Sequence, residues 1–456
     1  MFFAQLDEDV SSIICSFITT RRSLLRLALT CRAFHTIIIP TFLYARLEFG
    51  TLCIYSTAVK RLESFFHALR RHRSVGRAVR HLEIPSTEGL DRLWADSLPL
   101  MHHVRSLGIG WDPSPVLLKV VPTMSHLHTL SLGNACRPEL IELLRGIRLQ
   151  DLEISFQREC HLTPDSALGE ILLRSRDTLK ELKLCGIAWR FRPSSAQSAT
   201  SYDDGDPIWP HVIGLRLWNV SKDSHPINLT YHFPSVLCFD ISLNGQVELD
   251  QPYNCPFYAG LRSLEGSTED LKLADDSGAK LQRAHIIVQR VVTDSDFYKL
   301  PLRSTLQSLT LIVDFEFPLH CFGRLAAMCP KVRFLALHIE DEPCVGPPFE
   351  SILNNLADLP LECLYIHWDY VGEFSQRVHS SRHGKDVATF ARLAPMLLSS
   401  LRFISFTSLG WVTQMRRLVD VRGVADEFTK VPEEDGADSL QYYEWRWRDQ
   451  VEGRDQ

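Results

Sequence analysis

The chain has 456 residues, of which 45% are hydrophobic and 23% are charged, with 23 glycines and 24 prolines. This composition is typical of folded domains and excludes disordered, collagen-like and low-complexity chains. The formal net charge is −6, and the segment from Asp426 onwards, with ten acidic and four basic side chains, carries all of it. Because the other 425 residues are balanced, the composition argues against a nucleic-acid partner.

The cysteines and the apolar runs indicate a compartment. The twelve cysteines are scattered and none stands in a CxxC spacing, which is typical of reduced core residues in an intracellular protein. The first nine residues lack the basic start of a signal peptide, and no run approaches 18 uncharged apolar residues. We therefore expect a cytoplasmic or nuclear protein with no membrane span.

The first fifty residues hold three short runs with helical spacing, and Asp7 or Asp9 can cap the first of them. Three helices in about forty residues form a unit too small to be stable without packing on something else. A face that the rest of the chain leaves uncovered would be a docking surface. The runs are Val10, Ile13, Ile14 and Phe17; Leu24, Leu25, Leu27, Ala28 and Leu29; and Phe34, Ile37, Ile38 and Ile39.

One pattern then recurs along the chain: an apolar residue, two others, an apolar residue, one other, and an apolar residue. Most clear copies begin 22 to 33 residues apart, and weaker copies lie between Leu261 and Ile286. The clear copies are Val79/Leu82/Ile84, Val104/Leu107/Ile109, Leu127/Leu130/Leu132, Leu149/Leu152/Ile154, Leu179/Leu182/Leu184, Val212/Leu215/Leu217, Val236/Phe239/Ile241, Leu306/Leu309/Leu311, Val332/Leu335/Leu337, Leu361/Leu364/Ile366 and Leu401/Ile404/Phe406.

Each copy predicts a short strand with one buried face, because its last two apolar positions alternate. Helical spacing between copies predicts helices over Pro138–Leu144, Asp165–Leu173 and Pro348–Leu356. A single strand and helix cannot bury their own apolar faces, so neighbouring units must stack. The pattern favours an α/β solenoid with a parallel sheet on the concave side and helices on the convex side. The alternative is a chance scatter of leucines in an ordinary α/β domain.

These two parts, in this order, resemble a known family. Residues Leu6–Phe34, Ile39–Pro40 and Leu43–Tyr44 resemble the F-box, and the LxxLxL copies resemble leucine-rich repeats, as in fungal F-box/leucine-rich-repeat proteins. Asp7 departs from the Leu-Pro with which the family usually opens. The turn positions after each strand also depart from the Asn or Cys of the repeat consensus, which predicts an irregular array. Those positions hold Ala135, Ile187, Val220, Asp314 and Asp369.

The resemblance implies a substrate adaptor of a Skp/cullin/F-box ubiquitin ligase. It implies a helical module at 1–46 and a repeat solenoid at 47–425. The polar composition of 190–211 predicts a mobile insertion, and the charge of 426–456 predicts an acidic tail or cap. The F-box of this family binds a Skp-type linker subunit, while the repeats bind the substrate protein. The alternative is an interaction scaffold whose N-terminal helices only cap the solenoid. The implied linker-facing residues are Leu6, Val10, Ile13, Ile14, Leu24, Leu25, Phe34, Pro40 and Leu43.

Substrate contacts are expected on the concave strand face, at positions that alternate with the buried ones. Arg216 with Trp218, and Tyr365 with His367, place a large flat group beside a polar one, and binding hot spots are rich in such residues. Lys183 occupies the equivalent position one copy before Arg216. These five residues are the predicted substrate-binding set, although each is also compatible with plain surface.

Two further segments each allow two interpretations of their role. The basic run from Arg70 to Arg80 either complements the dipole of the apolar helix before it or forms a nucleic-acid patch, and the neutral surroundings favour the first. The segment Tyr442–Arg448 alternates aromatic and charged residues. It is interpreted as a strand that caps the last repeat, or as an exposed motif for a partner.

The sequence lacks the usual signatures of an enzyme: a phosphate loop, a GxGxxG turn and a GxSxG elbow. His379 and His383 stand four apart without the HExxH glutamate, and their Ser- and Gly-containing flanks predict a loop. We expect no catalytic residue, metal or cofactor. Three hypotheses remain in order of preference: ligase adaptor, repeat scaffold and unrecognised enzyme.

Overall fold

The computed structural model describes residues 8–16, 18, 21–49, 57–85, 90–110, 113–191, 207–242, 249–288, 297, 299–313, 319–341, 349–370, 376–408, 411–419 and 425–448. The chain divides into two compact units, Met1–Val236 with Leu243–Asn254, and Leu237–Ser242 with Cys255–Gln456. The boundary between the two units falls inside the repeat array, at the copy that begins with Val236. The predicted insertion at 190–211 lies mostly outside the described residues.

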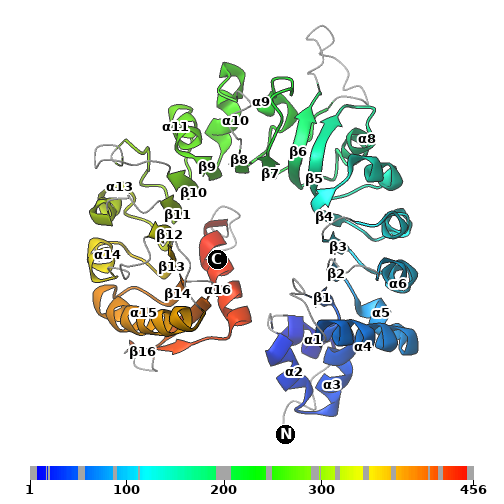
Figure 1. Cartoon of the computed structure of the whole chain (residues 1–456), viewed down its shortest axis with the longest axis horizontal. Coiled ribbons are helices and arrows are strands. Elements are labelled where there is room, and N and C mark those ends of the chain that lie inside the picture. Colours follow the sequence, from blue (N-terminus) through cyan, green and yellow to red (C-terminus); the bar gives the residue numbers. More distant parts are fainter. Residues whose placement is uncertain are drawn as a thin grey trace. The chain divides into compact units, whose positions relative to one another are not determined.

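The first unit begins with helices and continues as alternating strands and helical segments (Figure 1). Its strands pair in parallel with their neighbours in chain order. Its elements are α1 (Glu8–Ser16), α2 (Arg21–Ala28), α3 (Arg32–Ile38), η2 (Ile39–Leu43), β1 (Arg46–Glu48), α4 (Thr57–Arg71), α5 (Arg73–Ala78), β2 (His81–Ile84), α6 (Asp91–Ser97), η3 (Leu98–Leu100), β3 (Ser106–Ile109), α7 (Pro115–Leu118), η4 (Val121–Thr123), β4 (Thr129–Cys136), η5 (Pro138–Leu144), β5 (Asp151–Leu162), α8 (Ala167–Arg174), β6 (Glu181–Trp189), β7 (Gly214–Trp218), α9 (Leu229–His232) and η6 (Pro252–Asn254).

The second unit continues the pattern with parallel neighbours up to β14 and ends in two antiparallel strands and a helix. Its elements are β8 (Cys238–Ser242), α10 (Cys255–Gly260), β9 (Ser263–Ser267), α11 (Thr268–Asp276), β10 (Arg283–Val288), β11 (Ser308–Val313), η7 (Leu319–Arg324), α13 (Leu325–Met328), β12 (Phe334–Asp341), α14 (Phe349–Asn355), β13 (Cys363–Tyr370), α15 (Gln376–Leu397), β14 (Phe403–Ser408), β15 (Trp411–Val419), β16 (Ala425–Lys430) and α16 (Glu433–Trp445).

The repeat pattern is realised as rows of leucines in register. In the first unit Leu82 pairs with Leu107, Leu107 with Leu130 and Leu130 with Leu152 on successive strands, and all four side chains are at most 2% exposed. The second unit has an equivalent row. The weak copies between Leu261 and Ile286 are complete strands, β9 and β10. The predicted mixed α/β structure with a mostly parallel sheet is therefore confirmed, and its order is compatible with a solenoid.

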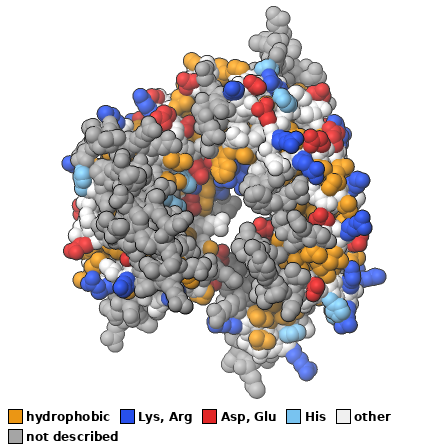
Figure 2. All heavy atoms as spheres, in the orientation of Figure 1, with side chains coloured by type: hydrophobic (Ala, Val, Ile, Leu, Met, Phe, Trp, Pro, Cys, Tyr) orange, Lys and Arg blue, Asp and Glu red, His pale blue; other side chains and the backbone are white. Residues whose placement is uncertain are grey.

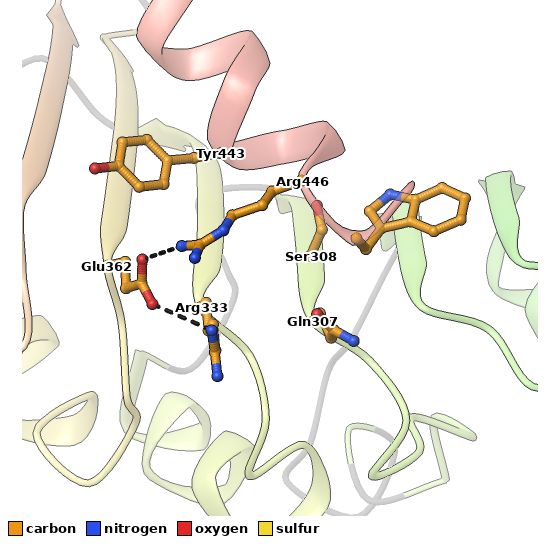
Figure 3. Close-up of a pocket in the computed structure, with 7 residues that line it drawn as sticks. Gln307, Ser308, Arg333, Glu362, Tyr443 and Arg446 are labelled. Carbon is orange, nitrogen blue, oxygen red and sulfur yellow. Dashed lines mark hydrogen bonds and ion pairs between the residues drawn. The ribbon is translucent and has the colours of Figure 1, made fainter. Parts of the chain in front are cut away.

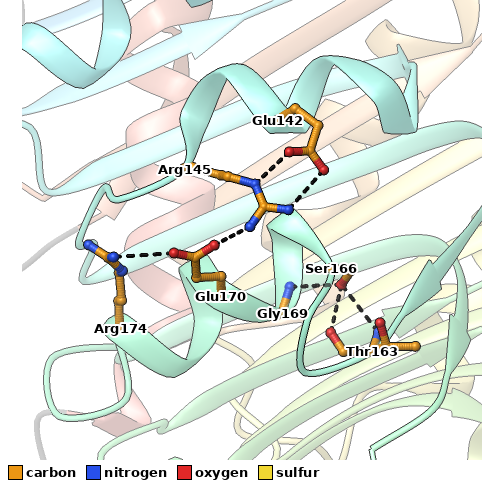
Figure 4. Close-up of polar contacts among 7 residues, drawn as sticks. All are labelled: Glu142, Arg145, Thr163, Ser166, Gly169, Glu170 and Arg174. Atoms are coloured by element: carbon orange, nitrogen blue, oxygen red, sulfur yellow. Dashed lines mark hydrogen bonds and ion pairs between the residues drawn. The ribbon is translucent and has the colours of Figure 1, made fainter.

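In each unit most helical segments cover the same face of the sheet (Figure 1). We call the opposite side the open face. On the helical side, ion pairs link neighbouring segments of the first unit, where Arg145 binds both Glu142 and Glu170, and Arg174 binds Glu170 (Figure 4). The Arg145 hydrogen bond lowers the pKa of Glu142. These side chains are 30–55% exposed, so the ion pairs contribute little to the free energy of unfolding.

The predicted helices differ from the observed ones in detail. Pro138–Leu144 forms a 3₁₀ helix, η5, in which Leu140, Ile141 and Leu144 are buried. The other two are α-helices, α8 and α14, with shifted ends. The loop expected around His379 and His383 is wrong, because these residues lie in the long helix α15. Neighbouring helices and the buried side chains of Phe390 and Ala394 outweigh the polar composition of its start.

Helix α8 begins at a turn that requires glycine. Ser166 caps the helix by accepting a hydrogen bond from the Gly169 amide at 3.1 Å, and its hydroxyl donates to the Thr163 carbonyl at 2.7 Å (Figure 4). A Cβ atom added to Gly169 would lie 1.9 Å from that carbonyl oxygen. The turn therefore excludes any larger residue.

Gly169→Ala is expected to destabilise the protein by about 2 kcal/mol, because the backbone must move to relieve the overlap and this outweighs the better helix propensity of alanine. Urea denaturation followed by tryptophan fluorescence measures the change. Gly384→Ala is the matched control, since Gly384 also lies in a helix and nothing surrounds its missing Cβ within 4 Å. Equal stability of the two variants would contradict this account of the turn.

A buried aromatic group occupies the end of the first unit. His232 is fully buried against Trp189, whose ring centroid lies 5.3 Å away, and its Nδ1 is 2.6 Å from the Pro207 carbonyl oxygen. Burial lowers the pKa of His232 to about 4. The imidazole is therefore neutral in the folded protein at neutral pH.

This burial predicts a stability loss in acid. In the unfolded chain the His232 side chain is protonated as the pH falls below its ordinary pKa of 6.5. In the folded chain it stays neutral down to about pH 4, so the free energy of unfolding falls between these two values. The loss is expected to approach about 3 kcal/mol. His232→Phe should flatten this dependence, whereas His211→Phe, at an exposed position, should keep it. The measurement is the urea midpoint between pH 7 and pH 4.5, and parallel curves for all three proteins would refute the prediction.

Candidate functional site

The first candidate surface lies on the N-terminal helices. Five large apolar side chains of α1, α2 and the turn after α2 are exposed, although most side chains of this type are buried elsewhere in the described chain. Uncovered hydrophobic side chains are also visible among charged ones over this region (Figure 2). We name these residues the α1/α2 apolar surface. They are Val10 (42% exposed), Ile13 (57%), Ile14 (37%), Leu25 (44%) and Leu29 (73%).

Other predicted linker-facing residues lie inside the module. Leu24 and Phe34 are 5% and 2% exposed and form a core with Cys15, Ala28 and Ile38. Leu43 is partly buried against this core. These side chains hold the three helices together and do not contribute to the exposed surface. Leu6 lies outside the described residues, and Pro40 lies in η2 with a side chain that the structure does not describe.

The module joins the repeats through η2, which packs on α5, and through β1, which pairs with β2. The Ala45 carbonyl accepts hydrogen bonds from the amides of Arg80 and His81, at 2.8 and 2.9 Å. Most later parallel strands join their neighbours through the same arrangement, so the first strand is an ordinary member of the row. The sequence pattern did not predict β1, because only Leu47 of its three residues is a buried apolar side chain.

The open face of the first unit brings three predicted substrate-binding residues together. Lys183 on β6 is in register with Arg216 on β7, and Trp218 is two residues along the same strand. The Arg216 guanidinium lies 4.3 Å from the centroid of the Trp218 ring, a cation–π arrangement. Lys183 Nζ is 3.3 Å from Glu153 Oε2 on β5. The three side chains are half-buried and form one aromatic and basic patch.

The open face of the second unit holds the other predicted pair. Tyr365 Oη and His367 Nδ1 are 3.2 Å apart on β13. The ring of His338 on β12 stacks on that of His367, with centroids 5.1 Å apart. Next to this pair the strand face is covered, because Leu440 and Tyr443 of α16 pack against the same buried cluster as Tyr365.

Helix α16 thus covers the open face of the second unit, on the side of the strands away from the other helices (Figure 1). The burial of the strand residues differs between the two units in agreement with this contact. Strand β6 alternates half-buried and buried residues over its first six positions, whereas every residue of β14 is buried. The predicted terminal cap is therefore a helix where a strand was expected, since residues 442–445 lie in α16.

Charged groups fix α16 to the strands. The buried Arg283 of β10 lies 2.5 Å from Glu444 Oε1 and 3.4 Å from Glu265 Oε2. Arg446, just after α16, lies 2.6 Å from Glu362, which also contacts Arg333 at 3.4 Å (Figure 3). The ion pairs of Glu444 and Arg446 therefore link the C-terminal segment to β10 and to the turn that precedes β13.

Sequence reasoning missed this contact, although a local signal existed. Pro432 precedes three acidic residues, which is typical of a helix start, and Leu440, Tyr443 and Trp447 recur at helical spacing. The pattern predicts an amphipathic helix. It does not tell which surface the helix covers, because the strands that receive it lie up to about two hundred residues earlier.

The basic run from Arg70 to Arg80 spans the end of α4, helix α5 and the turn before β2. Arg70, Arg71, Arg73 and Arg77 are exposed. Desolvation and neighbouring cations, His102 first, lower the pKa of His103. The position of Arg70 and Arg71 in the last turn of α4 agrees with the helix-dipole interpretation.

No family model matches the chain, and no curated protein matches it either. None of the described helices has both the length and the apolar character needed to cross a bilayer. The described residues contain no group of three or more His, Cys, Asp or Glu side chains that could hold a metal ion. The case for function therefore rests on the surfaces described above.

The α16 contact predicts unequal effects at two adjacent tyrosines. Tyr443 packs on Phe403 with ring centroids 6.2 Å apart, whereas the Tyr442 side chain is 53% exposed. Tyr443→Ala is expected to destabilise the second unit by about 1–2 kcal/mol, and Tyr442→Ala by less than about 0.5 kcal/mol. Urea denaturation of both variants tests this, and equal losses would show that α16 does not sit on the strands as described.

Proposed function

We propose that the protein is a substrate adaptor of a Skp/cullin/F-box type ubiquitin ligase, with an F-box at its N-terminus followed by leucine-rich repeats. The single observation that carries the proposal is the α1/α2 apolar surface. Val10, Ile13, Ile14, Leu25 and Leu29 expose apolar area on a small module whose core is already complete. An apolar patch that the described residues leave exposed is typical of a protein-binding surface.

The sequence resemblance and this surface support each other. The residues that resemble the F-box form three short helices and divide into a buried set, which builds the module, and an exposed set, which remains available to a linker subunit. The strand–helix succession supports the repeat half of the proposal, because its apolar rows occupy the LxxLxL positions.

In this proposal the repeats bind the substrate protein through the open face. The patch of Lys183, Arg216 and Trp218 on the first unit is the main candidate contact, since it combines basic groups with an aromatic ring that a partner can desolvate. Tyr365 and His367 on the second unit lie beside the surface that α16 occupies. The proposal includes no catalytic residue or cofactor, and we expect the protein to act in the cytoplasm or nucleus.

Capture of a Skp-type linker subunit tests the proposal. The wild-type chain co-expressed with the subunit is expected to retain it through affinity purification. Ile13→Asp or Leu25→Asp should reduce the retained subunit at least about tenfold, because an unpaired carboxylate in an apolar contact costs several kcal/mol.

Leu100→Asp and Val116→Asp are matched controls. Each replaces a side chain that is 45% exposed in the same unit but outside the N-terminal helices, so capture should be unchanged. Failure of the wild-type chain to capture the subunit would reject the ligase role. The next hypothesis in order of preference would then be a scaffold in which the N-terminal helices only cover the end of the repeats.

A further inference from the structure

The contact between α16 and the second unit is more polar than a core contact. Under the helix lie Ser308 and Ser405, 1% and 0% exposed, whose hydroxyls have no hydrogen-bond partner among the described residues. The Trp447 indole N–H, on the helical segment itself, has none either. Buried polar groups are normally paired, so α16 leaves part of the bonding capacity of this face unused.

The contact also contains a small, partly open pocket. A cavity of about 10 Å³, room for about one water molecule, lies between Ser308 and Gln307 on one side and Tyr443, Arg446 and Trp447 on the other (Figure 3). A polar contact with room for water resembles a reversible interface more than a packed core.

Charge makes the two sides complementary. Residues 431–448 hold five acidic and two basic side chains, part of the excess that gives the chain its negative charge. Arg283 and Arg416 of the strands meet Glu444 and Ser439 of α16, with Arg283 Nη2 2.5 Å from Glu444 Oε1 and Arg416 Nη2 2.7 Å from Ser439 Oγ. Arg283 keeps Ser263 and Glu265 as partners when α16 is removed, so departure of the helix leaves no isolated buried charge.

The apolar half of the contact is equally specific. Leu440 and Tyr443 pack on Phe334, Ala336, Cys363 and Phe403, and Trp447 is 3% exposed. These three side chains stand at positions i, i+3 and i+7 of the helical segment, which places them on one side of a helix. Glu444 and Arg446 flank this stripe and select the orientation through their ion pairs.

We propose that the strand face of the second unit is a docking groove for an acidic amphipathic helix, and that α16 is its resident occupant. We name it the β10–β15 groove. A partner helix with aromatic or leucine side chains at i, i+3 and i+7 and a glutamate at i+4 binds there by displacing α16. The groove is independent of the ligase role, whereas interpreting the partner helix as the ubiquitination substrate rests on the proposed function.

Tethering explains why the groove is occupied in the isolated chain. Only Val431 and Pro432 separate α16 from β16, so the helix is held near the groove at a high effective concentration. A free helix of the same sequence competes poorly until the tethered one is weakened. Weakening α16 without changing the groove therefore reveals the docking site.

The test uses the full chain and a fluorescent peptide with the sequence of residues 431–448. The chain variant carries Glu444→Arg with Arg446→Glu, which reverses both ion pairs and keeps the net charge. Fluorescence anisotropy should show the peptide binding at least about tenfold more tightly to this variant than to wild type. A peptide with the same two reversals should not bind.

Two controls locate the effect. Adding Arg283→Glu to the variant should abolish peptide binding, because Arg283 supplies the ion pair to Glu444 from the groove. The swap Glu142→Arg with Arg145→Glu reverses an exposed pair on the helical side of the first unit and should leave peptide binding at the wild-type level. Equal peptide affinity of the variant and the wild type, with circular dichroism unchanged, would overturn the proposal.

If the variant does not fold, amide hydrogen exchange of the wild-type chain tests whether α16 can leave the β10–β15 groove. A displaceable α16 exchanges its amides at least about tenfold faster than β12 to β14 under native conditions. Exchange of α16 only together with those strands would show a permanent part of the fold and overturn the proposal. Linker capture measured on the same proteins keeps the two hypotheses separate, since it depends on the α1/α2 apolar surface and not on the groove.

Discussion

The structure depends on the register of its apolar rows. Most parallel strands place two buried side chains against the corresponding pair of the next strand, as Leu107 and Ile109 do against Leu130 and Leu132. A shift of one residue in any strand would turn its buried side chains to the opposite face, so the register is fixed by burial. Backbone hydrogen bonds also join the starts of most neighbouring parallel strands. The Arg105 carbonyl, just before β3, accepts from the amides of His128 and Thr129, which lead into β4. The number of residues between successive strands can therefore vary, which explains how copies of different length form the same strand–helix unit.

The register also decides where function can lie. With one face of the sheet used for the core, the side chains between the apolar ones form a regular surface on the other face. In the first unit the half-buried side chains of Lys183, Arg216 and Trp218 are gathered on this face from two strands. In the second unit α16 covers the face and forms a contact with partly buried ion pairs. Burial and the carboxylates of Glu444 and Glu362 raise the pKa of the Cys363 thiol beneath it, which keeps that cysteine protonated and unreactive.

The N-terminal module illustrates a different use of apolar residues. Its own core is small, with Cys15, Leu24, Ala28, Phe34 and Ile38 fully or nearly buried. Such a core contributes little stability, and the contact of η2 with α5 attaches the module to the larger unit. Other apolar residues of α1 and α2 lie outside this core and are exposed, and they are the physical basis of the proposed partner binding. The helical spacing that identified these residues does not by itself separate the buried set from the exposed one.

The sequence by itself determined the elements that depend on local periodicity. The strand positions follow from the apolar spacing, and the N-terminal runs of helical spacing coincide with helices. Weak copies such as Ser263–Ser267 also form strands, because neighbouring strands supply the pairing that the local pattern lacks. The antiparallel strands β15 and β16 were not predicted, since they follow no repeat.

Only the tertiary structure decided which side chains face one another across long sequence distances. It separated Leu24 and Phe34 from Ile13 and Leu25, because the faces that a helix buries depend on its neighbours. It brought Glu444 to Arg283, 161 residues away, which no local pattern encodes. Periodicity specifies that a face is apolar, but the partner that covers it is chosen by the packing of the whole unit.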